Sequence, residues 1–68
     1  MNAILQTPKR VYSVAEAAQV LGVSESKVYQ LVRMQGFPTV MVGRRIKVSV
    51  QGLDRWIEEQ AEKGWIPA

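Results

Sequence analysis

The feature of this sequence that most limits its fold is a pair of helix signals joined by a very short connection. Ser13 followed by Glu16 is a capping-box pattern, in which each side chain satisfies a backbone amide at a helix start. Gly22 supplies a stop for this first helix, and Ser24 is the next N-cap candidate. Because so little chain separates them, the two short helices cannot run antiparallel and must cross steeply.

Apolar residues recur along both predicted helices at the period of one helix face. The stripe positions are Val14, Ala17, Ala18 and Leu21 in the first helix and Val28, Leu31 and Val32 in the second. The second stripe ends before Gly36 and Pro38, which stop the helix. Two amphipathic helices with this connection are expected to form a helix-turn-helix.

Residues 39–48 are rich in β-branched side chains and contain a glycine, which predicts a β-hairpin. If residues 43–45 form the loop, four apolar side chains share one face and Lys47 points the other way. These four are Val40, Val42, Ile46 and Val48. If residues 43 and 44 alone form the turn, Arg45 and Lys47 lie on the same face as Val40 and Val42. The apolar pattern favours the three-residue loop.

A third helix is predicted after Ser49, which can serve as its N-cap, and Gly64 ends it. Its apolar side consists of Val50, Leu53, Trp56 and Ile57, and its opposite side of Arg55, Glu58, Glu59 and Glu62. Trp56 and Phe37 are expected in the core because they continue the apolar stripes. The predicted fold is mainly α with a small β-hairpin, in the order helix, helix, hairpin, helix. We expect a flexible leader at residues 1–10, one domain at 11–63 and a short tail at 64–68.

Length and composition exclude several classes of protein. A chain of 68 residues can form one domain with a thin core, which leaves little room for a deep catalytic pocket. Cysteine and histidine are both absent, so disulfides, thiolate or imidazole metal sites and a histidine general base are excluded. We therefore expect no catalytic residue, no metal site and no cofactor. No apolar run approaches the roughly 18 residues of a membrane span, and a soluble cytoplasmic protein is expected.

The positive charge of the chain is concentrated in its first part. Residues 1–49 contain seven basic and two acidic residues, a net charge of +5, whereas residues 50–68 contain two basic and four acidic residues, a net charge of −2. A localised basic surface attracts a polyanion, while scattered lysines only favour solubility. The distribution is compatible with nucleic-acid binding and with a solvated basic surface.

The second helix has a polar outer face when its apolar stripe points inward. Arginine can read guanine and glutamine adenine in the DNA major groove, while hydroxyls and lysine hold phosphates. The candidate residues for this recognition helix are Ser24, Ser26, Lys27, Tyr29, Gln30 and Arg33. Any short amphipathic helix has such a polar face, so this helix alone does not distinguish DNA binding from solvation.

The hairpin tip adds a more specific signal. Two adjacent arginines at an exposed turn repel each other unless an anion lies between them. Glycine lets the backbone come close to a partner, and arginine on a narrow ribbon reaches phosphates or a minor groove. The candidate residues of this wing are Gly43, Arg44, Arg45 and Lys47. Together with the crossed helix pair, such a hairpin can engage adjacent grooves of one duplex.

Five segments of the chain also resemble a known family. They are Tyr12-Ser13-Val14-Ala15-Glu16-Ala17-Ala18, Leu21-Gly22-Val23-Ser24, Val28-Tyr29-Gln30-Leu31-Val32-Arg33, Val42-Gly43-Arg44-Arg45 preceded by Pro38, and Leu53-Asp54-Arg55-Trp56-Ile57. Their order and spacing resemble the excisionase-type helix-turn-helix proteins, a MerR-like winged-helix group, from Val11 to about Gln60. The resemblance implies a winged helix-turn-helix that binds double-stranded DNA. It also implies a recognition helix from Ser24 to about Gln35, with Arg44 and Arg45 at the wing tip.

Members of that group include excisionases of phages and conjugative elements, also called recombination directionality factors, and small AlpA-type transcriptional regulators. An excisionase would bind nearby sites and bend DNA so that an integrase assembles, whereas a regulator would occupy an operator. A third hypothesis is a protein-interaction module that docks through Trp65 and the acidic third helix without binding DNA. Trp65 can fold back onto the last helical turn. Alternatively, Trp65 and Ile66 can contact an integrase or a neighbouring copy of the chain.

Overall fold

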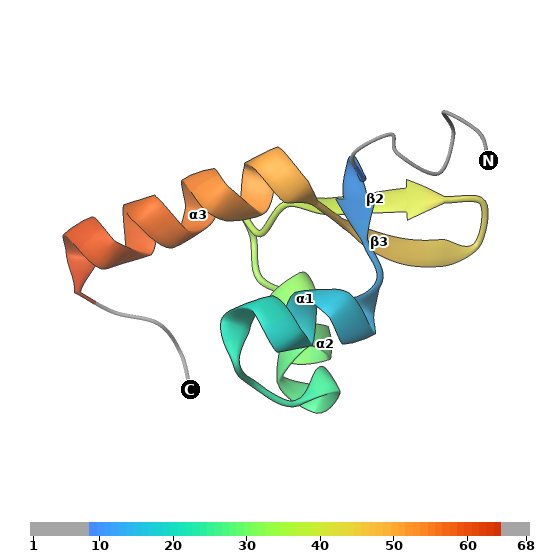
Figure 1. Ribbon diagram of the computed structural model, residues 1–68, viewed down its shortest axis with the longest axis horizontal. Helices are drawn as coiled ribbons and strands as arrows, with labels where there is room; N and C mark the ends of the chain where they lie inside the picture. The colour runs from blue at the N-terminus through green and yellow to red at the C-terminus, as the bar shows by residue number, and fades with distance from the viewer. Residues whose placement is uncertain (1–8, 65–68) are drawn as a thin grey trace, which may run out of the picture.

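A computed structural model of the protein describes residues 9–64, which form three helices and a three-stranded antiparallel sheet (Figure 1). The elements in chain order are β1 (Val11–Tyr12), α1 (Val14–Leu21), α2 (Glu25–Val32), β2 (Thr39–Val42), β3 (Arg45–Ser49) and α3 (Val50–Lys63). The predicted order of helix, helix, hairpin and helix is confirmed. Strand β1 was not predicted. Residues 1–8 of the predicted leader, together with Trp65 and Ile66, lie outside the described residues.

The start of α1 is fixed by a reciprocal cap. The Ser13 hydroxyl accepts a hydrogen bond from the backbone amide of Glu16 at 3.1 Å, and the Glu16 carboxylate accepts one from the Ser13 amide at 2.9 Å. The predicted capping box is therefore confirmed. The Lys9 ammonium forms an ion pair with the same carboxylate. This contact ties the segment before β1 to the first turn of α1.

The predicted N-caps of α2 and α3 and the predicted glycine stops of α1 and α3 are confirmed as well. Ser24 caps α2 and Ser49 caps α3, each through a side-chain oxygen that accepts from a backbone amide of the first turn. Gly22 and Gly64 end α1 and α3 at φ angles of 72° and 70°. In this left-handed region a Cβ is unfavourable, so glycine is the residue expected there.

The hairpin turn is shorter than predicted. Val42 of β2 pairs with Arg45 of β3, so the turn consists of Gly43 and Arg44 alone. The predicted three-residue loop is wrong. Gly43 has a φ of 61°, and no described residue other than glycine has a positive φ. A glycine at the first of two central positions is typical of a type II′ turn, whose twist matches that of the flanking strands.

This register changes which side chains share a face with the valines of β2. One face of the hairpin carries two aliphatic and two basic side chains, namely Val40, Val42, Arg45 and Lys47. The prediction that Val40 and Val42 share an apolar face with Ile46 and Val48 is therefore wrong, and the two valines are 37% and 51% exposed. The opposite face carries Val48, which is fully buried, and the half-buried Ile46. Turn geometry has outweighed the local apolar alternation.

The central strand of the sheet is β3, which pairs with β2 on one side and β1 on the other. Val11 lies opposite Ser49 and Tyr12 opposite Val48. The backbone amide of Val50 donates to the carbonyl of Arg10 at 3.1 Å. Helices α1 and α2 lie together on one side of the sheet, and α3 extends away from the hairpin tip along the long axis of the molecule (Figure 1).

One small core joins all the larger elements. Its buried apolar members are Val14, Ala17, Ala18, Val28, Leu31, Phe37, Val48, Leu53 and Trp56. The rings of Phe37 and Trp56 meet edge to face, with centroids 5.0 Å apart and an interplanar angle of 83°. Both aromatic residues were predicted in the core, and this is confirmed. Their contact connects the segment before β2 with α3 and thereby holds the base of the hairpin.

A close backbone approach fixes the start of α3 against the base of the hairpin. A Cβ placed on Gly52 would lie 2.6 Å from the Cβ of Pro38 and 3.0 Å from the Ser49 hydroxyl oxygen. Pro38 cannot withdraw easily, because its carbonyl accepts a hydrogen bond from the Ser49 amide at 2.9 Å. Glycine at position 52 is therefore required by packing and not by its backbone angles.

We expect Gly52→Ala to destabilise the protein, although alanine is the better helix former by about 1 kcal/mol. The new methyl group must displace Pro38, and overpacking of this kind typically costs about 1–3 kcal/mol. Urea unfolding followed by circular dichroism measures the free energy of unfolding. The matched control is Gln51→Ala at the preceding exposed position. This substitution should change the free energy of unfolding by less than about 0.5 kcal/mol. A more stable Gly52→Ala variant would contradict the packing argument.

The capping box makes the stability of the fold depend on pH. A hydrogen bond from the Lys9 side chain, with a further one from the Ser13 backbone, lowers the pKa of Glu16 below its ordinary value of 4.5. A carboxyl whose pKa is lower in the folded state stabilises the fold above the unfolded pKa. This contribution disappears as the pH falls through the folded pKa.

We therefore expect Glu16→Gln to lower the melting temperature at neutral pH and to approach the wild type as the solution is acidified below about pH 4.5. Thermal unfolding recorded from pH 7 to pH 2 provides the measurement. Lys9→Ala removes the largest cause of the lowered pKa of Glu16 and keeps the Ser13 contact. This variant should therefore also lower the melting temperature at neutral pH, but by less than Glu16→Gln. A difference in melting temperature between Glu16→Gln and the wild type that does not change with pH would refute this link between the protonation of Glu16 and stability.

Candidate nucleic-acid interface

Helix α2 has a buried face and a solvent-exposed face, as its sequence period predicts. Val28 and Leu31 are only 0% and 2% exposed and hold the helix in the core. Ser26, Gln30 and Arg33 point to the opposite side and are exposed. These three side chains are therefore available to a partner, because the core contacts of α2 leave that side of the helix uncovered.

The helix is shorter than predicted. It ends at Val32, not near Gln35, and Arg33 is its C-cap residue. The Arg33 amide donates to the carbonyls of Gln30 and Leu31, which closes the last turn. Arg33 thus lies at the end of the exposed face rather than in its middle, with an exposed side chain.

Two of the polar side chains of α2 are linked to each other. The Lys27 ammonium donates to the side-chain oxygen Oε1 of Gln30 at 3.2 Å. The amide nitrogen of Gln30 keeps its two donors. The Ser24 hydroxyl accepts from the Lys27 backbone amide at 3.1 Å and retains its own proton for donation. The polar face of α2 therefore offers mainly hydrogen-bond donors.

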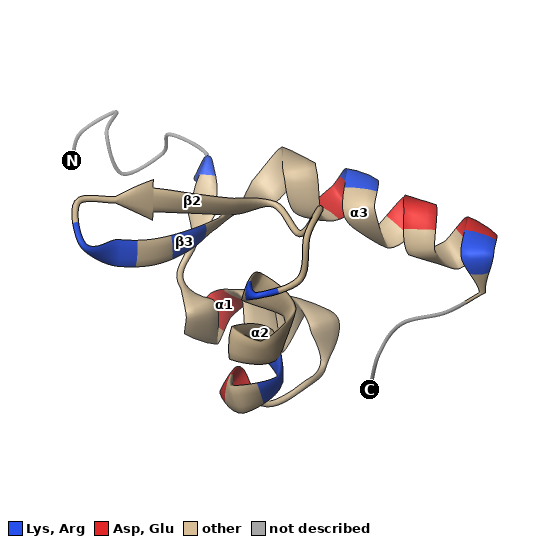
Figure 2. Ribbon diagram, turned by 180° about the vertical axis from the view of Figure 1, so that it is seen from behind, with Lys and Arg blue, Asp and Glu red and all other residues tan. Residues whose placement is uncertain are grey.

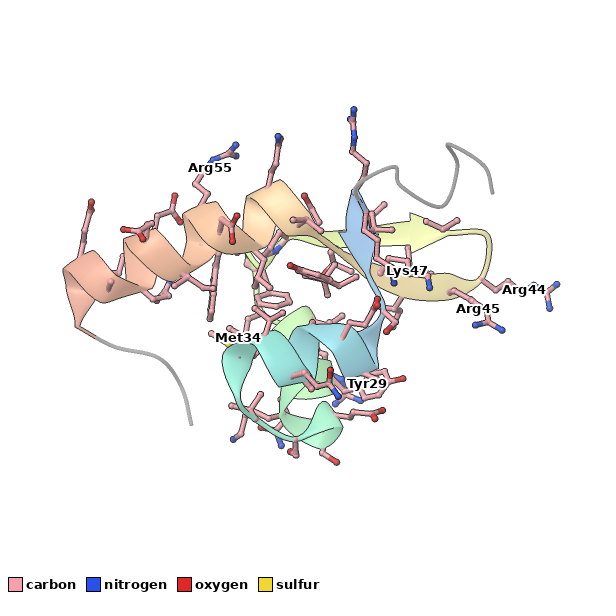
Figure 3. All side chains as sticks on the ribbon, in the orientation of Figure 1. Tyr29, Met34, Arg44, Arg45, Lys47 and Arg55 are labelled. Carbon is pink, nitrogen blue, oxygen red and sulfur yellow. The ribbon has the colours of Figure 1, made fainter. Side chains whose placement is uncertain are left out.

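An open groove of about 390 Å³ lies between the start of α1, the helix α2 and the hairpin. It is lined by Ser13, Val14, Ala15, Glu25, Tyr29, Arg44, Arg45, Ile46 and Lys47. Tyr29 is 48% exposed, and it points toward the end of the molecule from which the side chains of Arg44 and Arg45 project (Figure 3). The groove thus brings one predicted recognition residue together with three predicted wing residues.

The positive charge of the hairpin is not neutralised by the rest of the described chain. Arg44 and Arg45 are exposed, Lys47 is half-buried, and Gly43 forms the turn beside them. Within residues 9–64 the ion pair found is the one between Lys9 and Glu16. The three basic side chains of the hairpin therefore present their charge to solvent at one end of the molecule.

Other predicted residues do not line the groove. Ser24, Ser26, Lys27, Gln30 and Arg33 belong to the remainder of the α2 surface, so the candidate interface consists of that surface and the groove beside it. The groove also contains Glu25, which was not predicted. Its position directly after the N-cap Ser24 could have identified it from the sequence. The second helix of a helix-turn-helix presents its first residues to base edges.

Acidic residues lie mainly on α3, away from the groove. Asp54, Glu58, Glu59 and Glu62 are exposed there, interspersed with Arg55 and Lys63. Figure 2 shows these acidic positions along α3, while basic residues colour the hairpin at the other end of the molecule. The structure therefore separates the two charge regions that the sequence places before and after residue 49. A polyanion would meet the hairpin end and not α3.

No group of three or more acidic, cysteine or histidine side chains within residues 9–64 could hold a metal ion. None of the helices formed by those residues is long and apolar enough to cross a membrane.

Comparison with known proteins identifies the fold family. A family model described as a helix-turn-helix domain matches residues 11–61, which extend from β1 through most of α3. No curated protein and no solved structure matched the chain. The match covers the two crossed helices, the hairpin and the groove between them. The chain belongs to the helix-turn-helix domain family, and its three helices and small antiparallel sheet match a winged helix-turn-helix, a domain that suggests DNA binding.

Proposed function

We propose that this protein is an excisionase, a sequence-specific protein that binds and bends double-stranded DNA and so assists an integrase. The observation that carries the DNA-binding part is the groove that Tyr29 of α2 lines together with Arg44 and Arg45 of the hairpin. A helix of this diameter fits the major groove of B-form DNA. With α2 in that groove, the space beside it can receive the phosphate backbone, and the hairpin can reach the neighbouring groove.

The side chains of α2 divide into two roles in this proposal. Gln30 and Arg33 read base edges, since glutamine pairs with adenine and arginine with guanine. Lys27 holds the oxygen of Gln30 at 3.2 Å and so limits its rotation. Ser24, Ser26 and Tyr29 donate hydroxyl protons to phosphates, which position the helix without reading sequence.

The observed hairpin register supports a wing that binds the backbone. Arg45 and Lys47 alternate with Ile46 along β3 and therefore point to the same side. Arg44 occupies the turn itself, next to Gly43, whose missing side chain allows close approach to DNA. Three cations thus extend along a narrow ribbon whose tip can follow phosphates or enter a minor groove.

The excisionase role rests on the family and on the dual attachment to DNA. The helix-turn-helix domain family contains excisionase-type DNA-binding proteins. A protein that holds a duplex by a helix in one groove and a ribbon in the next can stabilise a bent geometry, because the bend allows more contacts. Such a protein assists recombination by shaping DNA for an integrase and performs no chemistry itself. A small transcriptional regulator would use the same contacts at an operator.

Removing the wing cations should weaken binding to every duplex. We expect Arg44→Ala combined with Arg45→Ala to lower affinity regardless of sequence. It should also reduce the slope of log affinity against log salt by about 2, since each lost phosphate contact removes about 0.9. Fluorescence anisotropy with a labelled duplex across a potassium chloride series provides both values. Arg55→Ala is the matched control, because Arg55 is an exposed arginine on α3 at a distance from the hairpin (Figure 3).

A variant in α2 distinguishes recognition of base edges from contacts with the phosphate backbone. Gln30→Ala should leave most of the salt dependence in place while it reduces the preference for one sequence over another. If neither the wing variant nor the Gln30 variant alters duplex affinity, the protein does not use this surface for DNA. The protein-interaction hypothesis would then replace the proposal.

Two functional assays distinguish the excisionase from the regulator. We expect the protein to stimulate excision of a flanked DNA segment by its cognate integrase, and the variant lacking both wing arginines to fail in this assay. Circular-permutation gel mobility should show that the bound duplex is bent. Repression of a reporter carrying the same site is measured in parallel. A protein that represses the reporter but never stimulates excision is a regulator and not an excisionase.

A further inference from the structure

Glu25 places one carboxylate in a groove whose other polar side chains carry cationic or hydroxyl groups. Glu25 is the first residue of α2, is exposed, and shares the groove with Tyr29, Arg44 and Arg45. A negative charge here opposes the approach of phosphates. Its placement therefore needs an explanation that the backbone-holding role of the groove does not supply.

The side chain is not used to hold the fold together. None of the side-chain hydrogen bonds or ion pairs within residues 9–64 involves the Glu25 carboxylate. Arg45 and Lys47 line the same groove but lie beyond ion-pair distance from it. The oxygens of Glu25 are thus free to accept hydrogen bonds from a bound molecule.

We propose that Glu25 reads a cytosine of the DNA target by accepting a hydrogen bond from its N4 amino group. This inference rests on the proposed DNA binding. In the major groove the exposed base donors are the amino groups of cytosine and adenine. Adenine also presents the acceptor N7 beside its amino group, which repels the second carboxylate oxygen, whereas carboxylates pair well with cytosine. Cytosine is therefore the base that fits this side chain.

The position of Glu25 within α2 supports this role. The first residues of the second helix in a helix-turn-helix point to base edges when that helix lies in the major groove. Glu25 lies one turn before Tyr29 on the same side of α2, and both line the groove. Tyr29 and the wing arginines can hold the sugar-phosphate backbone while the carboxylate reaches past it to a base. An acidic residue in the first turn also favours the helix dipole, but that effect does not depend on DNA sequence.

The test is selection of preferred sites from a random duplex pool by the wild type and by Glu25→Gln. We expect the wild-type motif to contain a position where cytosine is favoured over other bases by about fivefold to a hundredfold. In the variant that preference should disappear, and adenine should gain, because a glutamine amide can bond both N6 and N7 of adenine. The other positions of the motif should stay unchanged.

A matched control removes the same charge elsewhere. Glu58→Gln changes an exposed carboxylate on α3, away from the groove, and should retain the wild-type motif. A chemical control replaces the selected cytosine with a 2-pyrimidinone nucleoside, which still faces guanine but lacks the N4 amino group. This replacement should weaken DNA binding by the wild type by the same factor as its preference for cytosine, about fivefold to a hundredfold. It should leave the affinity of the Glu25→Gln variant unchanged. Circular dichroism confirms that each variant is folded.

The possible failures are distinct. If Glu25→Gln selects the same motif as the wild type and binds all duplexes more tightly, Glu25 only repels phosphates, and the inference is overturned while DNA binding stands. A motif whose Glu25-dependent position favours a base other than cytosine also overturns it. If the wild type selects no motif at all, the proposed sequence-specific binding fails and the role of Glu25 fails with it.

Discussion

The geometry of the candidate interface depends on one small core in which α2, β3 and α3 meet. Val28 and Leu31 come from α2, Val48 from β3 and Leu53 from α3, and all four are at most 2% exposed. Their shared burial fixes the outer face of α2 relative to the hairpin. A chain of this length buries a smaller share of its surface than larger domains do, so each of these side chains carries much of the stability. Loss of one would move the groove as well as weaken the fold.

Local features of the fold could be predicted because each is encoded within a few residues. The Ser13 capping box and the left-handed Gly22 depend only on their own helix ends. The exposed face of α2 could be predicted because its apolar residues recur at the period of one helix face. Features that join distant segments could not be predicted. Strand β1 exists because Val11 and Tyr12 find partners in β3, and glycine at position 52 is explained only by its contact with Pro38.

The hairpin shows which of two local signals is decisive when they disagree. Apolar alternation favoured one face shared by Val40, Val42, Ile46 and Val48, whereas Gly43 followed by Arg44 favours a two-residue turn, which is the turn that forms. The sheet has α1 and α2 on one side only, so exposing two valines costs less than forcing a turn with the wrong twist. The same register sets Arg45 and Lys47 side by side along β3. The groove and its carboxylate escaped prediction because they are formed by α1, α2 and β3 together.

A carboxylate within a cationic groove affects specificity more than affinity. The wing cations attract any duplex, and this attraction is the main part of non-specific binding. Glu25 reduces it for every sequence, because its charge opposes phosphates wherever the protein lands. At a site with a suitably placed cytosine, the hydrogen bond to N4 compensates for that repulsion. Since a genome offers many competing sites, the ratio between specific and non-specific binding decides occupancy. A weaker but more selective groove is therefore better suited to finding a few sites than a uniformly basic one.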